Sequence, residues 1–328
     1  MKIAILDDYQ SISQEMADWS ILPAGAQIER FSDHLDNEDQ LVERLQDFQI
    51  VMGMRERTPF HRSLLERLPQ LRLLITTGGR NASFDTVAAT ELGIICSGTG
   101  GQGEGPTELT WGLIIGLLRQ IPQEFQAAKH GIWGSTVGVG LKGKTLGLLG
   151  LGHIGSLVAR VGNAFDMRVI AWSQNLTQER ADECNATLVD KTTLFTESDV
   201  VSIHVRLSDR TLGLVTLQEL NMMKPTSYLI NISRGPIVVE TDLVQALKDG
   251  SIAGAGLDTF DVEPLHKDHP LLTLTNVLST PHIGYVTREG YQAFYSGVVE
   301  NINGYLGGEP IRVINPEVLE SSALRTSL

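Results

Sequence analysis

The sequence predicts an α/β fold built from two doubly wound parallel sheets. Short apolar runs alternate with amphipathic helical patterns along the chain, which is typical of parallel strands covered by helices on both faces. At 328 residues the chain also exceeds the usual size of one domain, so we expect two domains with a cleft between them. A glycine cluster from Gly98 to Pro106 interrupts the alternation and predicts a hinge or linker.

The first hundred residues predict the first of the two sheets. Its expected strands are Lys2–Leu6, Gln27–Phe31, Ile50–Met54, Arg72–Ile75 and Ile94–Ser97. Between the second and third strands, apolar residues from Asp39 to Phe48 recur on one helical face, and Asp36 or Asn37 is the expected cap. The apolar pattern from Pro106 to Leu118 predicts a longer helix, for which a dimer interface and a position in the chain's own core both stay open.

A second alternating series begins at Lys144 and predicts the second sheet. Its expected strands are Thr145–Leu149, Arg168–Trp172, Val200–Val205, Tyr228–Ile232, Gly254–Leu257 and Val277–Ser279. The last helical pattern, from Ala293 to Leu306, is placed so that it can cross back to the first domain. We therefore expect one domain from residues 1–100 and 286–328, and another from residues 101–285.

The composition argues against several classes of protein. Apolar residues make up 42% of the chain and charged residues 20%, which is ordinary for a protein with a sizeable core. The net charge of −13 disfavours general binding to nucleic acid. The first apolar run, Ile3 to Leu6, is too short for a signal-peptide core, and no stretch approaches the length of a membrane span. Cys96 and Cys184 lack metal-type spacing and favour reduced thiols in a cytoplasmic protein.

The turn Gly150-Leu151-Gly152-His153-Ile154-Gly155 predicts a nucleotide site because of its context. The strand from Thr145 to Leu149 precedes it, and a helical pattern from Ile154 to Phe165 follows it. The glycines would let the backbone approach a pyrophosphate at a helix N-terminus, where free N–H groups and the helix dipole favour anions. We therefore interpret the turn as part of a dinucleotide-binding domain rather than as a structural turn alone.

The end of the next strand, Ala171-Trp172-Ser173-Gln174-Asn175, is where NAD and NADP are normally distinguished. An acidic residue there binds the ribose 2′-hydroxyl and repels a 2′-phosphate, whereas Ser173 takes that place in this chain. Arg180 lies close in sequence, but we interpret it as a solvated charge on a helix. The sequence thus predicts NAD(P)(H) as the cofactor and leaves the choice between NAD and NADP open.

Three charged residues follow predicted strands of the second sheet: Arg234 in NISRGPI, Glu263 in DVEPL and His282 in STPHIG. An arginine fork suits a planar carboxylate, and an imidazolium both stabilises and protonates an oxygen that gains negative charge. A carboxylate beside the histidine favours its charged form. These parts predict hydride transfer between a nicotinamide cofactor and a 2-oxo or 2-hydroxy acid.

Several stretches are similar to those of a known family. They are GKTLGLLGLGHIG, MKPTSYLINISRGPIV, ALKDGSIAGAGLDTFDVEPL and NVLSTPHIG, with PTELTWGLIIGLLR and NINGYLGGEPIRVINP beside them. In this order the chain resembles the D-isomer-specific 2-hydroxyacid dehydrogenase family over nearly its whole length. The resemblance implies a Rossmann cofactor domain and a flavodoxin-like substrate domain, with the active cleft between them and hinges near residues 98–105 and 282–287.

Residue by residue, the resemblance implies that Arg234 binds the substrate carboxylate and carbonyl, that His282 transfers the proton, and that Glu263 is the partner of His282. The implied cofactor contacts are Gly150, Gly152, His153, Ile154, Gly155, Ser173, Gln174, Asn175, His204 and Asp258. The implied substrate contacts are Arg55, Gly78, Gly79, Arg80 and Tyr285.

Three of the family-matched positions, Arg80, Asp258 and Tyr285, keep two interpretations, and Arg206 is a further candidate. The family usually has a glycine and then an aspartate where this chain has Arg80-Asn81-Ala82, so Arg80 is either an added anion contact or an ion pair. Asp258 either accepts a hydrogen bond from the nicotinamide carboxamide or caps the next turn. Arg206 stands where many relatives have proline, which would let it approach a ribose phosphate. Tyr285 either narrows the pocket or packs against the opposite domain.

The function that these observations favour is NAD(P)-dependent reduction of glyoxylate, hydroxypyruvate or a related 2-oxo acid, or oxidation of a D-2-hydroxy acid. The alternatives are the same scaffold acting on phosphoglycerate or phosphite, and a nucleotide-sensing corepressor or scaffold protein. The expected partners are the small acid and a second copy of the chain bound through the Rossmann domain, with no nucleic acid and no membrane. His266 and His269 lie in a proline-flanked loop without a matching ligand set, so we expect no metal.

Overall fold

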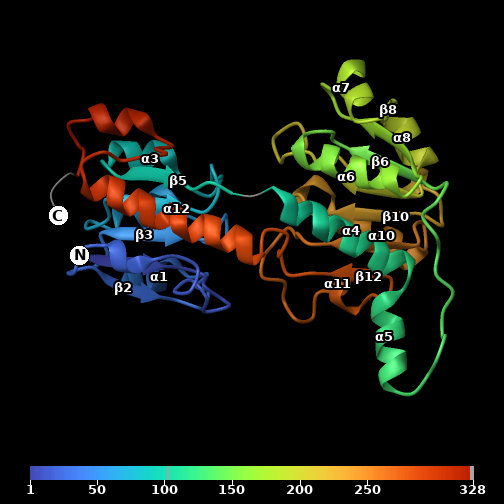
Figure 1. The fold of residues 1–328 in the computed structure, drawn as a ribbon, viewed down its shortest axis with the longest axis horizontal. Coiled ribbons are helices and arrows are strands. Elements are labelled where there is room, and N and C mark those ends of the chain that lie inside the picture. The colour runs from blue at the N-terminus through green and yellow to red at the C-terminus, as the bar shows by residue number, and fades with distance from the viewer. Residues whose placement is uncertain (102, 326–328) are drawn as a thin grey trace. The chain divides into compact units, whose positions relative to one another are not determined.

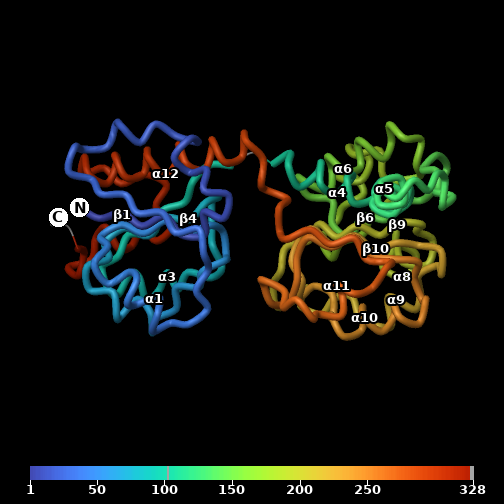
Figure 2. The backbone as a smooth tube through the Cα atoms, turned by 90° about the horizontal axis from the view of Figure 1, so that it is seen from below, coloured from blue at the N-terminus to red at the C-terminus, as the bar shows by residue number. Residues whose placement is uncertain are grey.

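The computed structural model describes residues 1–101 and 103–325, which fall into two compact units. Unit 1 comprises residues 1–101 and 286–325, and unit 2 comprises residues 103–285. Each unit contains one parallel sheet flanked by helices, as Figures 1 and 2 show. The predicted fold class, α/β with two doubly wound sheets, is therefore confirmed.

Unit 1 has a five-stranded sheet in the order β2-β1-β3-β4-β5, and every neighbouring pair is parallel. Its strands are β1 (Lys2–Ile5), β2 (Gln27–Arg30), β3 (Ile50–Gly53), β4 (Leu73–Thr76) and β5 (Ile95–Gly98). Its helices are α1 (Glu38–Leu45), α2 (Arg62–Glu66), α3 (Thr86–Glu91) and α12 (Arg288–Leu306), with 3-10 turns at Trp19–Ile21 and Pro316–Glu320. Helix α12 lies on one face of the sheet, and α1 and α3 lie on the other (Figure 2).

Helices α1 and α12 begin at side-chain caps. The side-chain oxygen of Asn37, one of the two predicted caps, accepts a hydrogen bond from the Gln40 N–H at 3.1 Å. The Thr287 hydroxyl accepts from the Gly290 N–H at 2.9 Å, so α12 begins at Arg288 and not at the predicted Ala293. A cap outside the apolar pattern thus adds a turn that periodicity alone misses.

Unit 2 has a seven-stranded sheet in the order β12-β11-β10-β9-β6-β7-β8, again parallel throughout. Its strands are β6 (Thr145–Leu149), β7 (Arg168–Trp172), β8 (Thr187–Leu188), β9 (Val200–Ile203), β10 (Tyr228–Asn231), β11 (Gly254–Leu257) and β12 (Val277–Ser279). Its helices are α4 (Glu104–Leu118), α5 (Ile121–Lys129), α6 (His153–Ala164), α7 (Gln178–Glu183), α8 (Lys191–Glu197), α9 (Leu217–Met222), α10 (Glu240–Asp249) and α11 (Pro270–Thr273), with a 3-10 turn at Gly235–Ile237. Helices α4 and α6 lie on one face, and α8, α9 and α10 lie on the other (Figure 2).

The long apolar helix α4 lies in the core of its own unit. Trp111, Leu113 and Ile114 are buried in the same hydrophobic cluster as residues of β6 and α6. The helix also packs against β11 and β12. Of the two interpretations of this helix, the structure supports the core position, because its apolar side chains already have partners within unit 2.

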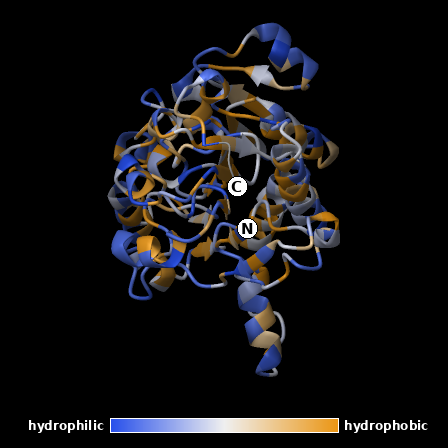
Figure 3. Cartoon of the chain, turned by 90° about the vertical axis from the view of Figure 1, so that its left-hand side faces the viewer, coloured by the Kyte–Doolittle hydropathy of each residue, from blue (hydrophilic) through white to orange (hydrophobic). Residues whose placement is uncertain are grey.

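Exposed apolar side chains gather on α5 and on the segment that follows it. These side chains are Ile121, Phe125, Ile132, Trp133 and Val137. Helix α5 projects from the rest of unit 2 in Figure 1, and in Figure 3 the projecting helix at the bottom mixes hydrophobic and hydrophilic positions. Trp133 is 87% exposed and Val137 is 90% exposed, so this segment finds no core within the described chain. Among the described residues, no helix combines the length and the apolarity that a bilayer crossing requires.

Candidate active site

Six strands of the sheet in unit 2 end in one row. Across β7, β6, β9, β10, β11 and β12, the paired residues of this row are Trp172, Leu149, Ile203, Asn231, Leu257 and Ser279. The carboxyl ends of parallel strands share one edge of a sheet, which is where doubly wound domains bind ligands. The predicted cofactor and proton-transfer residues of unit 2 all follow a member of this row, so the sheet brings them to the same edge.

Each glycine of the turn after β6 has a separate structural reason. Gly150 has a φ of +105°, a backbone conformation that other residues rarely adopt. A Cβ atom at Gly155 would lie 2.3 Å from the Gly150 carbonyl oxygen, so only glycine lets α6 pack so closely against the turn. A Cβ atom at Gly152 would meet nothing within 4 Å. The space beside Gly152 is therefore open for a ligand that approaches the backbone.

Helix α6 begins at this turn without a side-chain cap. Its first N–H groups consequently lack the partner that a capping side chain would supply, which suits an anionic ligand. The side chain of His153 lies against Gly103, where a Cβ atom would come within 2.6 Å of Nε2. Ile154 packs against the hydrophobic cluster of α4 and β6. These two predicted contacts can therefore serve a pyrophosphate through their backbone rather than through their side chains.

A cavity of about 530 Å³ opens beside the turn, a volume that suits a small-molecule ligand. Its lining comes from the turn after β6, the segment after β7 and the loop after β9. The lining residues are Gly150, Leu151, Gly152, Ser173, Gln174, Asn175, Leu176, Thr177, Arg180, His204, Val205, Arg206, Leu207, Ser208, Arg210 and Thr211. Most of the predicted cofactor contacts thus meet at one cavity.

Two arginines of this cavity differ from the sequence interpretation. Arg180 was interpreted as a solvated charge, but it lines the cavity and its Nε donates to the Leu151 carbonyl at 3.2 Å. It also pairs with Glu183 at 2.8 Å. Arg210 was not predicted at all. Its only signal in the sequence is its position within the loop after β9, which periodicity does not link to a site.

His204 presents a buried nitrogen at the cavity. Its Nε2 lies 2.9 Å from the Ser202 hydroxyl, while its buried Nδ1 has no hydrogen-bond partner among the described residues. Burial lowers the pKa of His204 to about 3, so the ring is neutral at pH 7. A buried polar atom without a partner is costly, and this one belongs to a residue that lines the cavity. The lining therefore fits a ligand with polar groups.

His282 and Glu263 are in close contact at the ends of β11 and β12, on the other half of the edge. His282 Nδ1 lies 2.6 Å from Glu263 Oε2, and Glu263 Oε1 accepts from the Phe260 N–H at 2.9 Å. The His282 side chain is 14% exposed and the Glu263 side chain 26%. The Tyr285 ring stands edge-on to the imidazole, with its centroid 5.7 Å away. Because Nδ1 is held by the carboxylate, Nε2 is the nitrogen that can exchange a proton with a substrate.

Asp258 braces the backbone that carries His282. Its Oδ1 accepts from the Thr280 hydroxyl at 2.6 Å and from the Ile283 N–H at 2.8 Å, and its Oδ2 accepts from the Gly284 N–H at 2.8 Å. Burial raises the pKa of Asp258, and these hydrogen bonds act in the opposite direction. The turn-capping interpretation of Asp258 is thus what the structure displays, while a contact with the cofactor stays a prediction.

Arg234 lies in a turn fixed by Asn231, the last residue of β10. The Asn231 amide donates to the Arg234 carbonyl at 2.9 Å, and its oxygen accepts from the Ser233 N–H at 3.0 Å. The next residue, Gly235, approaches the backbone after β11 so closely that a Cβ atom there would lie 2.1 Å from the Phe260 carbonyl carbon. Sequence reasoning missed both Asn231 and Gly235, although each belongs to the NISRGPI motif. They hold the Arg234 turn against the segment that leads to Glu263.

In unit 1, the ends of β3 and β4 bring Arg55 and Gly78 together. Arg55 Nη1 donates to the Thr77 carbonyl at 3.2 Å, and a Cβ atom at Gly78 would lie 2.0 Å from the same nitrogen. Arg55 has a φ of +54°, and the Asn81 amide donates to its carbonyl. Asn81, which departs from the family pattern, is buried and therefore acts as a support for this strained position.

The two following positions of the loop in unit 1 face solvent. Gly79 and Arg80 are exposed, and no described atom lies within 4 Å of where a Gly79 Cβ atom would be. Arg80 pairs with no carboxylate among residues 1–101 and 103–325. Both interpretations of Arg80, the anion contact and the ion pair, therefore stay predictions.

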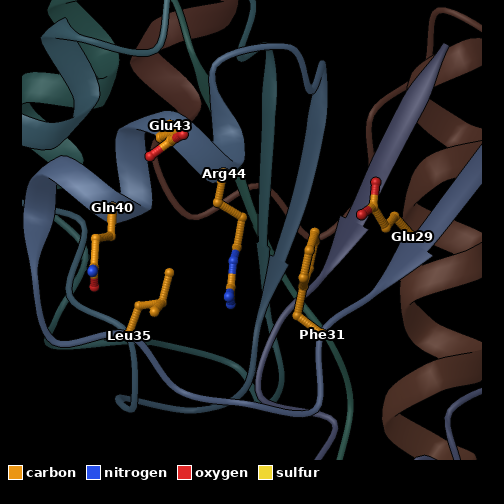
Figure 4. Close-up of a pocket in the computed structure, with 6 residues that line it drawn as sticks. All are labelled: Glu29, Phe31, Leu35, Gln40, Glu43 and Arg44. Carbon is orange, nitrogen blue, oxygen red and sulfur yellow. The ribbon is translucent and has the colours of Figure 1, made fainter.

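Two other features of the described chain are weaker candidates for a binding site. A hollow of about 380 Å³ lies between β2 and α1 in unit 1, but its Arg44 stacks on Phe31 and pairs with Asp33 at 2.6 Å (Figure 4). Its only cation is thus already engaged. His269 Nε2 lies 2.9 Å from Glu240 Oε1, and no group of three metal-binding side chains occurs among the described residues.

Comparisons with known proteins agree with this arrangement. The family model for the D-isomer specific 2-hydroxyacid dehydrogenase, NAD binding domain, matches residues 111–284. A glyoxylate reductase from Aeropyrum pernix is 38% identical over 78% of this chain and 80% of its own length. A hydroxypyruvate reductase from Blautia hydrogenotrophica is 30% identical over 96% of this chain and 100% of its own.

Solved structures show the same likeness. A provisionally assigned D-3-phosphoglycerate dehydrogenase oxidoreductase from Ralstonia solanacearum superposes with a TM-score of 0.92 at 38% identity, covering 99% of both chains. The match thus extends over both units and not only over the nucleotide-binding one. This chain belongs to the D-isomer-specific 2-hydroxyacid dehydrogenase family, and it is an oxidoreductase that uses a nicotinamide cofactor.

Proposed function

We propose that this enzyme reduces a small 2-oxo acid of the glyoxylate or hydroxypyruvate class to the corresponding 2-hydroxy acid. The observation that carries the proposal is the 2.6 Å contact between His282 Nδ1 and Glu263 Oε2, at the strand ends next to the Arg234 turn. It supplies a fixed proton donor beside a carboxylate-binding cation. The substrate class follows from the names of the relatives, several of which are glyoxylate or hydroxypyruvate reductases.

His282 moves the proton in this mechanism. As the carbonyl oxygen of the substrate gains negative charge, Nε2 of the imidazolium stabilises it and then protonates it. Glu263 holds Nδ1, so the ring keeps one orientation and its charged form has a nearby counter-charge. In the oxidation direction the same nitrogen takes the proton from the hydroxyl group.

Arg234 binds the substrate carboxylate with its guanidinium fork and so orients the carbonyl towards His282. Asn231 and Gly235 keep the turn of Arg234 in place through the contacts described above. Our further candidates for substrate contact are Arg55, Gly78, Gly79, Arg80 and Tyr285.

The cofactor is held at the other half of the edge. Gly150, Gly152 and Gly155 bring the start of α6 to the pyrophosphate, and Ser173, Gln174, Asn175 and His204 line the cavity for the adenosine part. When bound, the nicotinamide supplies or accepts the hydride. The open space at Gly152 and the uncapped start of α6 support this assignment.

The test is the absorbance of the reduced nicotinamide with glyoxylate, hydroxypyruvate, 3-phosphohydroxypyruvate and a short panel of other 2-oxo acids, each offered with NADH and with NADPH. We expect oxidation that is lost in His282→Ala and kept in the matched control His266→Ala, whose side chain is 77% exposed. Preference for the phosphorylated acid would move the substrate class to phosphoglycerate. If no acid of the panel caused oxidation of the reduced nicotinamide, although the cofactor was tightly bound, the proposal would be refuted.

We also propose that two copies of the chain associate through unit 2. The candidate surface is α5 with the following segment, where Phe125, Trp133 and Val137 expose apolar area. Burial of these side chains in a twofold contact would remove that area from water. Sedimentation should show a dimer for the wild type and a monomer for Trp133→Ser, and a monomeric wild type would contradict the proposal.

A cytoplasmic location likewise remains our proposal. Cys96 and Cys184 are free and buried, as expected for thiols that never pair. Burial raises the pKa of Cys96 to about 12, which keeps that thiol protonated and unreactive. Fractionation of the native cells would test the location.

A further inference from the structure

The cofactor cavity contains no carboxylate. None of the residues that line it is Asp or Glu, although Asp and Glu outnumber Lys and Arg in the chain by 39 to 26. Ser173 follows Trp172 at the end of β7, where an acidic residue would bind the ribose hydroxyl groups and repel a phosphate on them. Nothing in the lining therefore opposes an added phosphate.

Three arginines line the same cavity. Arg180 comes from α7, and Arg206 and Arg210 come from the loop after β9. Arg180 is held by its bonds to the Leu151 carbonyl and to Glu183. The side chains of Arg206 and Arg210 form no hydrogen bond or ion pair with any residue of the described chain. Two cations without a counter-charge thus face a cavity of an otherwise acidic protein.

The loop that carries Arg206 and Arg210 is internally fixed. The Thr211 hydroxyl donates to the Arg206 carbonyl at 2.6 Å and accepts from the Ser208 N–H at 2.8 Å. The turn between the two arginines is therefore closed by its own hydrogen bonds and does not depend on a ligand for its shape. The guanidinium groups of Arg206 and Arg210 therefore remain available to bind a ligand.

We propose that Ser173, Arg180 and Arg206 form a subsite for a phosphate group on the ribose 2′-hydroxyl, so that this enzyme binds NADPH in preference to NADH. The inference rests on the nicotinamide-dependent reduction proposed above. Guanidinium forks bind phosphate oxygens bidentately, and a phosphate dianion would supply the counter-charge that the cavity lacks. Arg210 lies further along the same loop and strengthens the positive field.

A pyrophosphate alone does not account for these arginines. That group is met by the backbone at Gly152 and by the start of α6, whereas Ser173 and Arg180 belong to the segment after β7. The segment after the second strand of such a domain is the one that reads the ribose. The positions of the cations along the fold therefore point to a phosphate at the ribose.

The experiment measures nucleotide binding by the intact enzyme without substrate. Dissociation constants for NADPH, NADH, adenosine 2′,5′-bisphosphate and 5′-AMP are obtained by calorimetry for the wild type and for Arg206→Gln, Arg180→Gln and Arg160→Gln. The last variant is the matched control, because Arg160 is an exposed arginine of unit 2 outside the cavity. Glutamine keeps the aliphatic stem and removes the charge.

We expect the wild type to bind NADPH at least about tenfold tighter than NADH, and the bisphosphate tighter than 5′-AMP. Arg206→Gln should reduce the NADPH preference about tenfold, Arg180→Gln should reduce it as well, and Arg160→Gln should keep it. Equal affinities for NADPH and NADH in the wild type, or equal losses for both in Arg206→Gln, would overturn the subsite. Because no 2-oxo acid is present, a wrong substrate class cannot change these results.

Discussion

The two halves of the carboxyl edge in unit 2 differ in how their side chains are used. Beyond β10, β11 and β12, the functional side chains are bonded to one another and to the backbone, as between His282 and Glu263 or between Asp258 and the Ile283 N–H. Beyond β7, β6 and β9, the side chains line an open cavity, and Arg206 has no side-chain partner within the described chain.

The difference corresponds to two tasks. A proton donor is most effective when its geometry is fixed before the substrate binds. The hydrogen bonds that orient His282 are accordingly present in the structure without a substrate. A recognition site gains affinity from groups that satisfy their hydrogen bonds only when the ligand is bound. We therefore expect mutations in the first half to change turnover, and mutations in the second half to change the choice of ligand.

The largest expected effect is that of His282→Ala. Turnover with the best 2-oxo acid should fall about 10²–10⁴-fold, because the proton donor to the carbonyl oxygen is lost. The affinity for the reduced cofactor, measured by calorimetry, should stay close to that of the wild type, because the cavity lies at the other half of the edge. A matching loss of cofactor affinity would show that the two halves are not separable.

Arg234→Lys should have the next largest effect. A lysine keeps the charge but cannot bind a carboxylate bidentately, so kcat/KM should fall about 10–100-fold. Saturation kinetics with the 2-oxo acid at a fixed, saturating cofactor concentration measures this. Lys248→Arg, on the exposed end of α10, serves as the reverse control, which should leave kcat/KM unchanged. Unchanged kinetics in Arg234→Lys would show that another group holds the carboxylate.

The sequence predicted the first half of the edge better than the second. Arg234, Glu263 and His282 each belong to a motif that ends a strand, and parallel strands in sequence bring such ends together. Their roles stay predictions, but their positions after the ends of strands could be predicted from periodicity, whereas the order of those strands is given by the structure. The supports at Asn231 and Gly235 could not be predicted, because a close backbone approach leaves no pattern of apolar residues.

The second half depends on residues without a motif. Whether Arg180 turns to solvent or to the cavity is decided by its bond to the Leu151 carbonyl, a contact between segments that no periodicity encodes. The fold class followed from the alternation of strands and helices, whereas the two-residue strand β8 (Thr187–Leu188) is too short to show a pattern. Tertiary contacts thus decide the details that the sequence leaves open.

Ser173→Asp tests the recognition half with a single substitution. The new carboxylate would stand at the end of β7, bind ribose hydroxyl groups and repel a 2′-phosphate, so the ratio of NADH to NADPH affinity should rise about tenfold. Fluorescence titration with both cofactors measures the ratio. The unchanged kcat expected with saturating NADH would separate recognition from chemistry, and an unaltered affinity ratio would mean that this strand end does not meet the ribose.

The recognition half should also change the pH dependence of stability, through His204. Burial lowers the pKa of this histidine to about 3, whereas its ordinary pKa is 6.5. Between these two values the unfolded chain binds a proton that the folded chain does not bind, so the free energy of unfolding falls as the pH falls below 6.5. One group contributes at most about 1.4 kcal/mol per pH unit to this slope.

Replacing the histidine by a residue that does not titrate isolates its contribution. Between pH 7.5 and pH 5, His204→Gln should lose up to about 2 kcal/mol less unfolding free energy than the wild type. Urea unfolding of both proteins at the two pH values measures the difference. Because the wild type and His204→Gln share all other titratable groups, subtracting one pH dependence from the other cancels the contributions of those groups. Parallel pH profiles would mean that the ring is hydrated in solution, and the cavity would then be wetter than the contacts of His204 imply. In that case water would reach even the buried side chains beyond β7, β6 and β9. The two halves of the edge would then differ more, because the side chains around His282 are bonded to one another.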